Sequence, residues 1–229
     1  MTVEHNIIEG NKNMETEDNH APLVLKCIDF RTSKNTENWL EEQGLKRGDY
    51  YLYASAGATG NPKGFMESVK SEGHSAITAV DHQDCGFYKK NGDDSTQAHH
   101  HNLELLGENL YSENPNIKYN YHLLPVADDR HACIATAIIL GQPEMVRLAR
   151  EKLDDLGLAD DHDEIARPHA LSVDDETLWN DLEISLSLHS PTKILLFEKD
   201  EENAKRLMEK IKEIAAHMQV ESIMLAPAA

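Results

Sequence analysis

Short apolar runs recur through the first half of the chain and predict strands. They lie at 23–30, 49–54, 76–80 and 117–125, and each has the length of a buried strand. The segments between them carry helix start and stop signals, at 35–45, 62–72 and 96–111. Alternation of strand and helix is typical of a parallel sheet with right-handed crossovers. We therefore expect an α/β fold with a parallel β-sheet core flanked by helices.

The second half repeats this rhythm. The pattern predicts strands at 193–197 and 221–225, a strand or a helix at 133–140, and at most a short strand at 164–166. It predicts helices at 143–156, with Pro at the first position, and at 176–188. An apolar stripe from Ala204 to Met218 predicts one more amphipathic helix.

Charge narrows the range of partners. The chain of 229 residues has 41 acidic and 22 basic residues, a formal net charge of -19. Nucleic acid and anionic membranes are not expected partners, because binding to either needs patches of Lys and Arg. No apolar run of about 18 residues and no apolar signal segment occurs, so we expect a cytoplasmic protein. The odd number of cysteines, three, argues against a disulfide framework.

Chemical side chains follow two of the predicted strands. Cys27, Asp29 and Arg31 stand at every second position, so we expect them in one row on one face of the first strand. His82 and Cys85 follow the strand at 76–80. Zinc takes four ligands, commonly thiolate and imidazole. Cys27, His82 and Cys85 are therefore candidate zinc ligands, provided that the two strands are neighbours.

The fourth ligand stays open at this point. Water in that position makes a catalytic site, whereas Asp29 makes a closed one. Arg31 matters because it can pair with Asp29 through two hydrogen bonds and hold the carboxylate off the metal.

The two halves also align with each other. Gly44 falls on Gly157, Ile77–Val80 falls on Ile194–Phe197, and the opening strand falls on Thr136–Glu144. One interpretation is a tandem duplication whose degenerate second copy has lost the ligands. The other is one α/β domain with additional crossovers. We divide the chain into a polar N-terminal arm at 1–21, a zinc-binding α/β domain at 22–130, and a C-terminal α/β half at 131–229.

Three other features are given structural interpretations. His99, His100 and His101 are expected at an exposed helix start, since successive helical residues point about 100° apart and cannot share one ion. The glycine-rich stretch 57–64 lacks the spacing of a phosphate-binding loop. Cys133 is expected to be a buried core thiol.

Cys27-x-Asp29-x-Arg31 followed by His82-x-x-Cys85-Gly86 resembles the zinc signature of the β-class carbonic anhydrases. The separation of the two motifs and the order of elements are also similar, over residues 22–125. The resemblance implies that Cys27, His82 and Cys85 bind zinc. It also implies that Asp29 and Arg31 form a catalytic dyad that gates the fourth position.

The same resemblance implies that the chain is a zinc lyase. Zinc-bound hydroxide would hydrate carbon dioxide reversibly to bicarbonate. The resemblance also implies a homodimer or a higher even oligomer, because the sites of that family lie at subunit interfaces.

The chain departs from the family pattern in places. Ala54-Ser55-Ala56-Gly57-Ala58 keeps only the central Ala-Gly of the family's Arg-Asn-Ala-Gly-Asn, and no substrate-binding Gln precedes the first strand. The family's antiparallel closing strand is not evident either. Two alternatives therefore stay open. One is hydrolysis of carbonyl sulfide or carbon disulfide, and the other is a non-catalytic zinc-stabilised protein with Asp29 as the fourth ligand.

Overall fold

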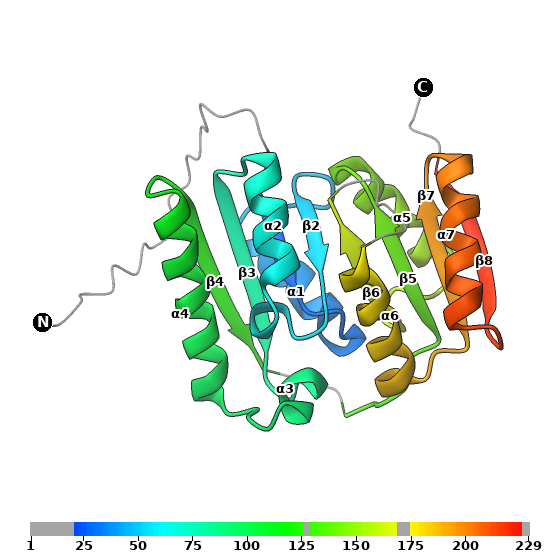
Figure 1. Ribbon diagram of the computed structural model, residues 1–229, viewed down its shortest axis with the longest axis horizontal. Coiled ribbons are helices and arrows are strands. Elements are labelled where there is room, and N and C mark those ends of the chain that lie inside the picture. The colour runs from blue at the N-terminus through cyan, green and yellow to red at the C-terminus, as the bar shows by residue number, and fades with distance from the viewer. Residues whose placement is uncertain (1–20, 126–128, 169–174, 226–229) are drawn as a thin grey trace, which may run out of the picture.

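Eight strands form one continuous sheet through the molecule (Figure 1). The computed structural model describes residues 21–125, 129–168 and 175–225. The strands are β1 (Leu23–Lys26), β2 (Tyr51–Ala54), β3 (Ala76–His82), β4 (Lys118–Leu124), β5 (Ala135–Leu140), β6 (His162–Arg167), β7 (Lys193–Glu198) and β8 (Gln219–Met224). The predicted arm at 1–21 lies outside the described residues except for Ala21.

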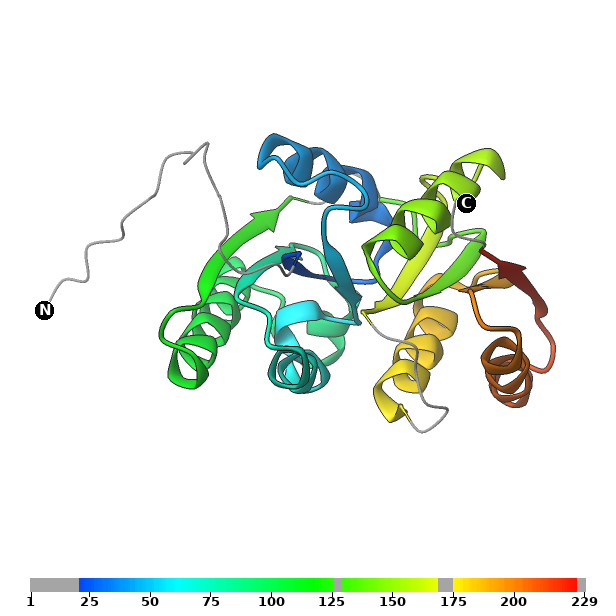
Figure 2. The same cartoon turned by 90° about the horizontal axis from the view of Figure 1, so that it is seen from above.

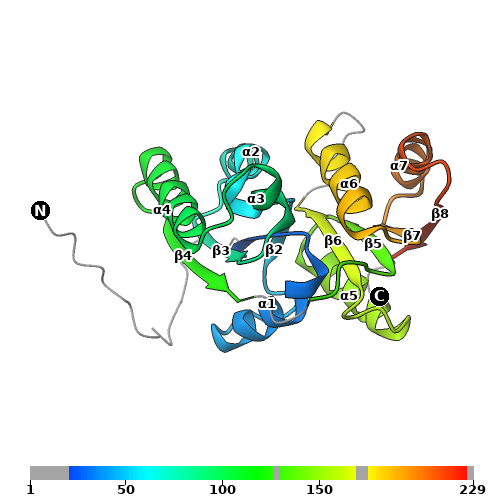
Figure 3. The ribbon, with the colours of Figure 1, turned by 90° about the horizontal axis from the view of Figure 1, so that it is seen from below.

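Seven α-helices and one 3-10 turn connect the described strands. They are α1 (Phe30–Glu42), η1 (Ala58–Gly60), α2 (Lys63–Glu72), α3 (Gly86–Lys90), α4 (Thr96–Glu113), α5 (Pro143–Asp155), α6 (Glu176–His189) and α7 (Glu201–Ile214). Figures 2 and 3 show α1 and α5 on one face of the sheet, and α2, α4, α6 and α7 on the other. The predicted α/β class with a sheet between helices is therefore confirmed.

The strand order is β4-β3-β1-β2-β6-β5-β7-β8. Strands within each half are parallel, but β2 meets β6 antiparallel at the pair Ala54–Ala166. The expectation of a parallel sheet thus holds inside each half and fails at the centre. The order of the first four strands, read from the edge inwards, is repeated by the last four.

The pairing register repeats as well. Leu23 of β1 pairs with Ile77 of β3, and Thr136 of β5 pairs with Ile194 of β7. These are the positions that the sequence alignment of the two halves placed on each other. The two four-stranded units therefore share strand order and register. They join edge to edge, where β2 pairs with β6.

Alternate residues of the central strands supply two apolar cores. Leu23 and Leu25 pack in the cluster under α2, α4, α6 and α7, whereas Val24 packs in the cluster under α1 and α5. This alternation follows from the two-residue period of a strand. Because both faces are covered, the inner strands are buried except at Tyr51 and Lys193, the first residues of β2 and β7.

Buried charges also join the two halves. Lys26 Nζ of β1 lies 2.8 Å from Glu164 Oε2 of β6, and Arg150 of α5 holds the same carboxylate through two hydrogen bonds of 2.7 Å. On the other face, Arg167 pairs with Asp181 at 2.6 Å. Both reach the first half, since Arg167 donates to the Ala54 carbonyl at 2.8 Å and the Ala56 amide donates to Asp181 at 2.9 Å. A buried ion pair is maintained only when its groups are fully partnered, so these contacts fix how the halves meet.

Two predicted strands differ most from the structure in their extent. The first strand ends at Lys26 instead of continuing to residue 30, because Asp29 caps α1 and its side chain accepts from the Arg31 amide. Of the two alternatives for 133–140, the strand is confirmed, as β5 at Ala135–Leu140. The short strand expected at 164–166 is the six-residue β6. Its polar residues had obscured a fully buried strand, and ion pairs and hydrogen bonds compensate for their burial.

Candidate metal centre

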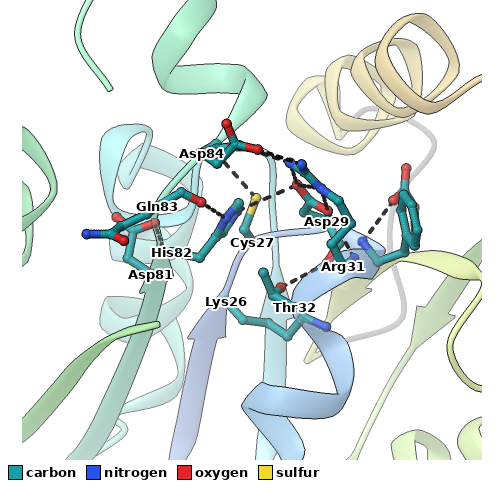
Figure 4. Close-up of polar contacts among 12 residues, drawn as sticks. Lys26, Cys27, Asp29, Arg31, Thr32, Asp81, His82, Gln83 and Asp84 are labelled. Carbon is teal, nitrogen blue, oxygen red and sulfur yellow. Dashed lines mark hydrogen bonds and ion pairs between the residues drawn. The ribbon is translucent and has the colours of Figure 1, made fainter. Parts of the chain in front are cut away.

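Cys27, His82 and Cys85 come together at the carboxyl ends of two neighbouring strands. Figure 4 shows Cys27 beside His82 at this edge of the sheet. Cys27 directly follows β1, His82 is the last residue of β3, and Cys85 is the N-cap of α3. β1 and β3 are paired in parallel, as the zinc prediction required. One ligand atom from each residue lies within 4.8 Å of the other two. The three side chains are 4%, 1% and 1% exposed.

The distances suit a tetrahedral metal ion. The two sulfur atoms are 3.9 Å apart, and two thiolates on one zinc lie about 3.8 Å apart for Zn–S bonds of about 2.3 Å. His82 Nδ1 lies 2.8 Å from the Gln83 carbonyl oxygen, to which it donates, while the buried Nε2 has no hydrogen-bond partner within the described structure. Buried polar atoms without a partner are uncommon. A metal ion would supply one here, so the three residues fit a metal.

The pKa values of His82 and Cys27 are both raised. Burial lowers the pKa of His82, but the adjacent Cys27 and Asp29 outweigh burial and raise this pKa to about 9. The hydrogen bond with Cys85 and burial raise the pKa of the Cys27 thiol well above its usual value. Metal binding requires thiolates and a neutral imidazole. With both pKa values raised, the thiol and the imidazole hold protons that an entering metal ion must displace.

Asp29 and Arg31 are close together, but not in the predicted way. They do not share a strand face, because Asp29 caps α1 and Arg31 lies in its first turn. Arg31 Nη2 donates to Asp29 Oδ2 at 2.7 Å, and Nε donates to Oδ1 at 3.0 Å. Burial raises the pKa of Asp29, but the Arg31 guanidinium and His82 bring it below its usual value. Asp29 is therefore an ionised carboxylate held by arginine.

The same guanidinium reaches the second motif. Arg31 Nη1 donates to Asp84 Oδ2 at 2.7 Å, and Nη2 donates to the Asp84 carbonyl at 2.9 Å. Asp84 has a left-handed backbone with φ of 60°, which is uncommon for a residue other than glycine. Arg31 thus ties the loop after β1 to the turn that carries His82 and Cys85 (Figure 4).

Comparisons of the chain with protein-family models, curated proteins and solved structures found no match.

The second half supplies a histidine that the sequence gave no reason to select. His189, at the end of α6, places Nε2 4.0 Å from Asp29 Oδ2. Its Nδ1 lies 2.7 Å from Asp163 Oδ2 of β6, and the Phe30 amide donates to Asp163 Oδ1 at 3.2 Å. Asp163 therefore orients His189 and anchors the start of α1 beside the metal centre.

The backbone of the His82–Cys85 turn is held by two aspartates. Asp81 Oδ1 accepts from the His82 amide at 2.9 Å, and Asp94 Oδ1 accepts from the Cys85 amide at 3.0 Å. His99 lies between these carboxylates with no exposed surface. The prediction of an exposed helix start is therefore wrong for His99 and right for His100 and His101.

Two other predictions concern residues outside the candidate ligand group. Cys133 is buried, and burial raises the pKa of its thiol to about 12, which confirms the core interpretation. Gly57 has φ of 73°, and a Cβ there would lie 2.1 Å from the Phe87 ring. The glycine is thus explained by backbone conformation and by this close contact.

Among the described residues, no helix is both long and apolar enough to cross a bilayer.

Proposed function

We propose that this chain is a zinc enzyme that hydrates carbon dioxide reversibly to bicarbonate. Cys27, His82 and Cys85 hold the metal in this proposal. Zinc, when bound, supplies a Lewis acid that makes water a nucleophile near neutral pH. The support lies in the ligand types, their convergence within 4.8 Å, and the resemblance of both motifs to the β-class carbonic anhydrases.

One observation favours an open fourth position. Both oxygens of Asp29 are engaged by Arg31, and a bidentate arginine–carboxylate pair is a strong one. The carboxylate is therefore occupied elsewhere and leaves room for water. In this proposal Asp29 accepts a hydrogen bond from the reacting water and orients it, while Arg31 keeps Asp29 ionised and in place.

A closed, non-catalytic zinc centre is the second candidate. Asp29 Oδ2 lies 3.9 Å from His82 Nε2, close to the spacing between two ligands of one ion. In this candidate Asp29 leaves Arg31 and becomes the fourth ligand. A crystal structure of the zinc-loaded protein separates the two, because a closed site has an Asp29 oxygen about 2.0–2.2 Å from zinc, whereas an open site has water there and Asp29 still paired with Arg31.

The repeated strand order and register support a duplication origin. A carboxylate is also repeated, since Asp81 and Glu198 each accept from the amide of the next residue, His82 and Lys199. In this proposal the second copy has lost its ligands. It stands where a second subunit would stand, and supplies His189 next to Asp29. An even oligomer of the whole chain remains part of the proposal.

Stopped-flow hydration of carbon dioxide by the zinc-loaded protein tests the function. We expect turnover between about pH 7 and 9 that is absent in Cys85→Ser. The same preparations assayed with carbonyl sulfide and carbon disulfide identify a related hydrolase. Zinc-loaded protein that is inactive on carbon dioxide contradicts the proposed activity.

A further inference from the structure

We propose that His99 is a positioning residue of the metal centre, which holds together the two aspartates that fix the backbone of His82 and Cys85. The inference rests on the metal-binding part of the proposed function, and not on the hydration reaction. It concerns a residue outside the two motifs that suggested the centre.

The turn from His82 to Cys85 has few backbone contacts of its own that could set the ligand spacing. The amides of both ligand residues donate to carboxylates instead. Asp81 Oδ1 receives the His82 amide at 2.9 Å, and Asp94 Oδ1 receives the Cys85 amide at 3.0 Å. Asp81 belongs to β3, whereas Asp94 lies in the loop between α3 and α4. The position of Cys85 therefore depends on where that loop places Asp94.

His99 connects the two carboxylates. Its Nδ1 lies 3.1 Å from Asp81 Oδ2, and its Nε2 lies 3.0 Å from Asp94 Oδ1. Each ring nitrogen of His99 faces an oxygen of a different carboxylate, so the ring bridges the two aspartates. Charge-assisted hydrogen bonds of this kind are stronger than neutral ones. His99 thus fixes the loop aspartate relative to the strand aspartate.

The surroundings hold the ring in this orientation. The His99 ring lies 3.9 Å from the Tyr88 ring, centroid to centroid. The Tyr88 hydroxyl donates to Asp81 Oδ2 at 3.0 Å, and Asn102 donates to that hydroxyl at 3.0 Å. His99 has no exposed surface. The enclosed ring is therefore held in place, and it can fix the positions of the two aspartates that bind the amides of His82 and Cys85.

Loss of a group that orients metal ligands typically weakens metal binding about 10–100-fold. His99→Asn removes a side chain that spans both carboxylates, since Asn is too short to reach them together. His100→Asn is the matched control, because the neighbouring residue is exposed on the same helix. Zinc affinity is measured by competition with a chromophoric chelator. Cobalt(II) spectra report coordination geometry independently of folding stability.

We expect His99→Asn to bind zinc about 10–100-fold more weakly and to change the cobalt thiolate charge-transfer bands, while His100→Asn matches the parent in both. Wild-type affinity and wild-type bands in a folded His99→Asn overturn the proposal. If that variant does not fold, by far-UV circular dichroism, Asp94→Asn is used. It keeps an oxygen for the Cys85 amide but weakens the link to His99, so unchanged zinc affinity and bands there overturn it.

These outcomes are separable from the proposed activity. A protein that binds zinc, responds to His99→Asn and fails to hydrate carbon dioxide retains the positioning role and loses the proposed reaction. A wild-type protein that binds no zinc overturns both.

Discussion

Arg31 donates hydrogen bonds to both carboxylate oxygens of Asp29, from Nη2 to Oδ2 at 2.7 Å and from Nε to Oδ1 at 3.0 Å. Both side chains are almost fully buried. Asp29 on the metal would close the proposed centre, and Asp29 on arginine leaves it open. The contact between these two residues is therefore where the proposed activity can be tested most directly.

Arg31→Ala should abolish turnover and leave zinc bound. Without the guanidinium, Asp29 is no longer held off the metal, and we expect a loss of at least about 100-fold in kcat. Zinc content by atomic absorption should stay equal to that of the parent. Lys34→Ala is the control, because Lys34 is an exposed cation on the same helix. Turnover retained in Arg31→Ala contradicts the gating role.

Removal of metal should destabilise the protein. A ligand that binds only the folded state adds about 2.7 kcal/mol when present at 100 times its dissociation constant. Urea unfolding with zinc and with a chelator should differ by about this amount. Cys27→Ser should erase the difference. Cys133→Ser should keep it, because Cys133 is equally buried but lies outside the ligand group. Equal zinc effects in both variants contradict the assigned ligands.

Much of the fold and of the candidate ligand group followed from the sequence, for identifiable reasons. Apolar runs located the described strands other than β6, because most buried strands need continuous apolar surface. β6 has the sequence HDEIAR and was expected as at most a short strand. Cys27, His82 and Cys85 converge because they follow two paired parallel strands, which short-range pattern and spacing can indicate. The N-cap at Asp29 was not predicted, because Phe30 extends the apolar pattern of the first strand. In the structure the Asp29 side chain accepts a hydrogen bond from the Arg31 amide, so helix α1 begins at Phe30.

The remaining parts depend on tertiary contacts that no local pattern encodes. The local sequence indicates an exposed histidine at position 99. Only the fold brings Asp81 and Asp94 to the two nitrogens of its ring. His189 came from a helix of the other half. The central antiparallel pair Ala54–Ala166 reverses the sheet direction, although each half alone is regular.

Gly57→Ala should destabilise the fold through two separable effects. Its φ of 73° is costly for alanine, by about 1–2 kcal/mol, and the new Cβ would also meet the Phe87 ring at 2.1 Å. Gly44→Ala is the matched control, since φ there is 85° and no atom lies within 4 Å of a Cβ. Urea unfolding should show a larger loss at position 57. Adding Phe87→Ala to Gly57→Ala should restore only the part of the lost unfolding free energy that exceeds the loss in Gly44→Ala. Equal losses at both glycines contradict the steric effect.

Glu164→Gln should cost about 3–5 kcal/mol of unfolding free energy at pH 7, because it leaves Lys26 and Arg150 buried without their carboxylate. Glu151→Gln, which alters an exposed pair on the same helix as Arg150, should cost less than about 1 kcal/mol. Chemical denaturation at fixed pH provides both values. A similar cost for the two substitutions contradicts the role assigned to the buried cluster.

The same carboxylate predicts an acid response. Burial raises the pKa of Glu164, but Arg150 and Lys26 outweigh burial and hold the pKa well below its usual value. A lowered folded-state pKa means that this stabilisation is present above about pH 4.5 and is lost as the pH falls through the folded-state value. Glu164→Gln should therefore show a shallower loss of stability below pH 4.5 than the parent. An unchanged pH slope contradicts this assignment.

The pairing of β2 with β6 inside the sheet makes the two halves poor candidates for separate production. Division of the chain between them would turn two interior strands into open edges, which readily pair with other chains. It would also strip Lys26 of Glu164 and Asp181 of Ser55. Either fragment alone should aggregate, whereas the two produced together should reassemble, so the smallest unit that folds independently is the whole eight-stranded sheet.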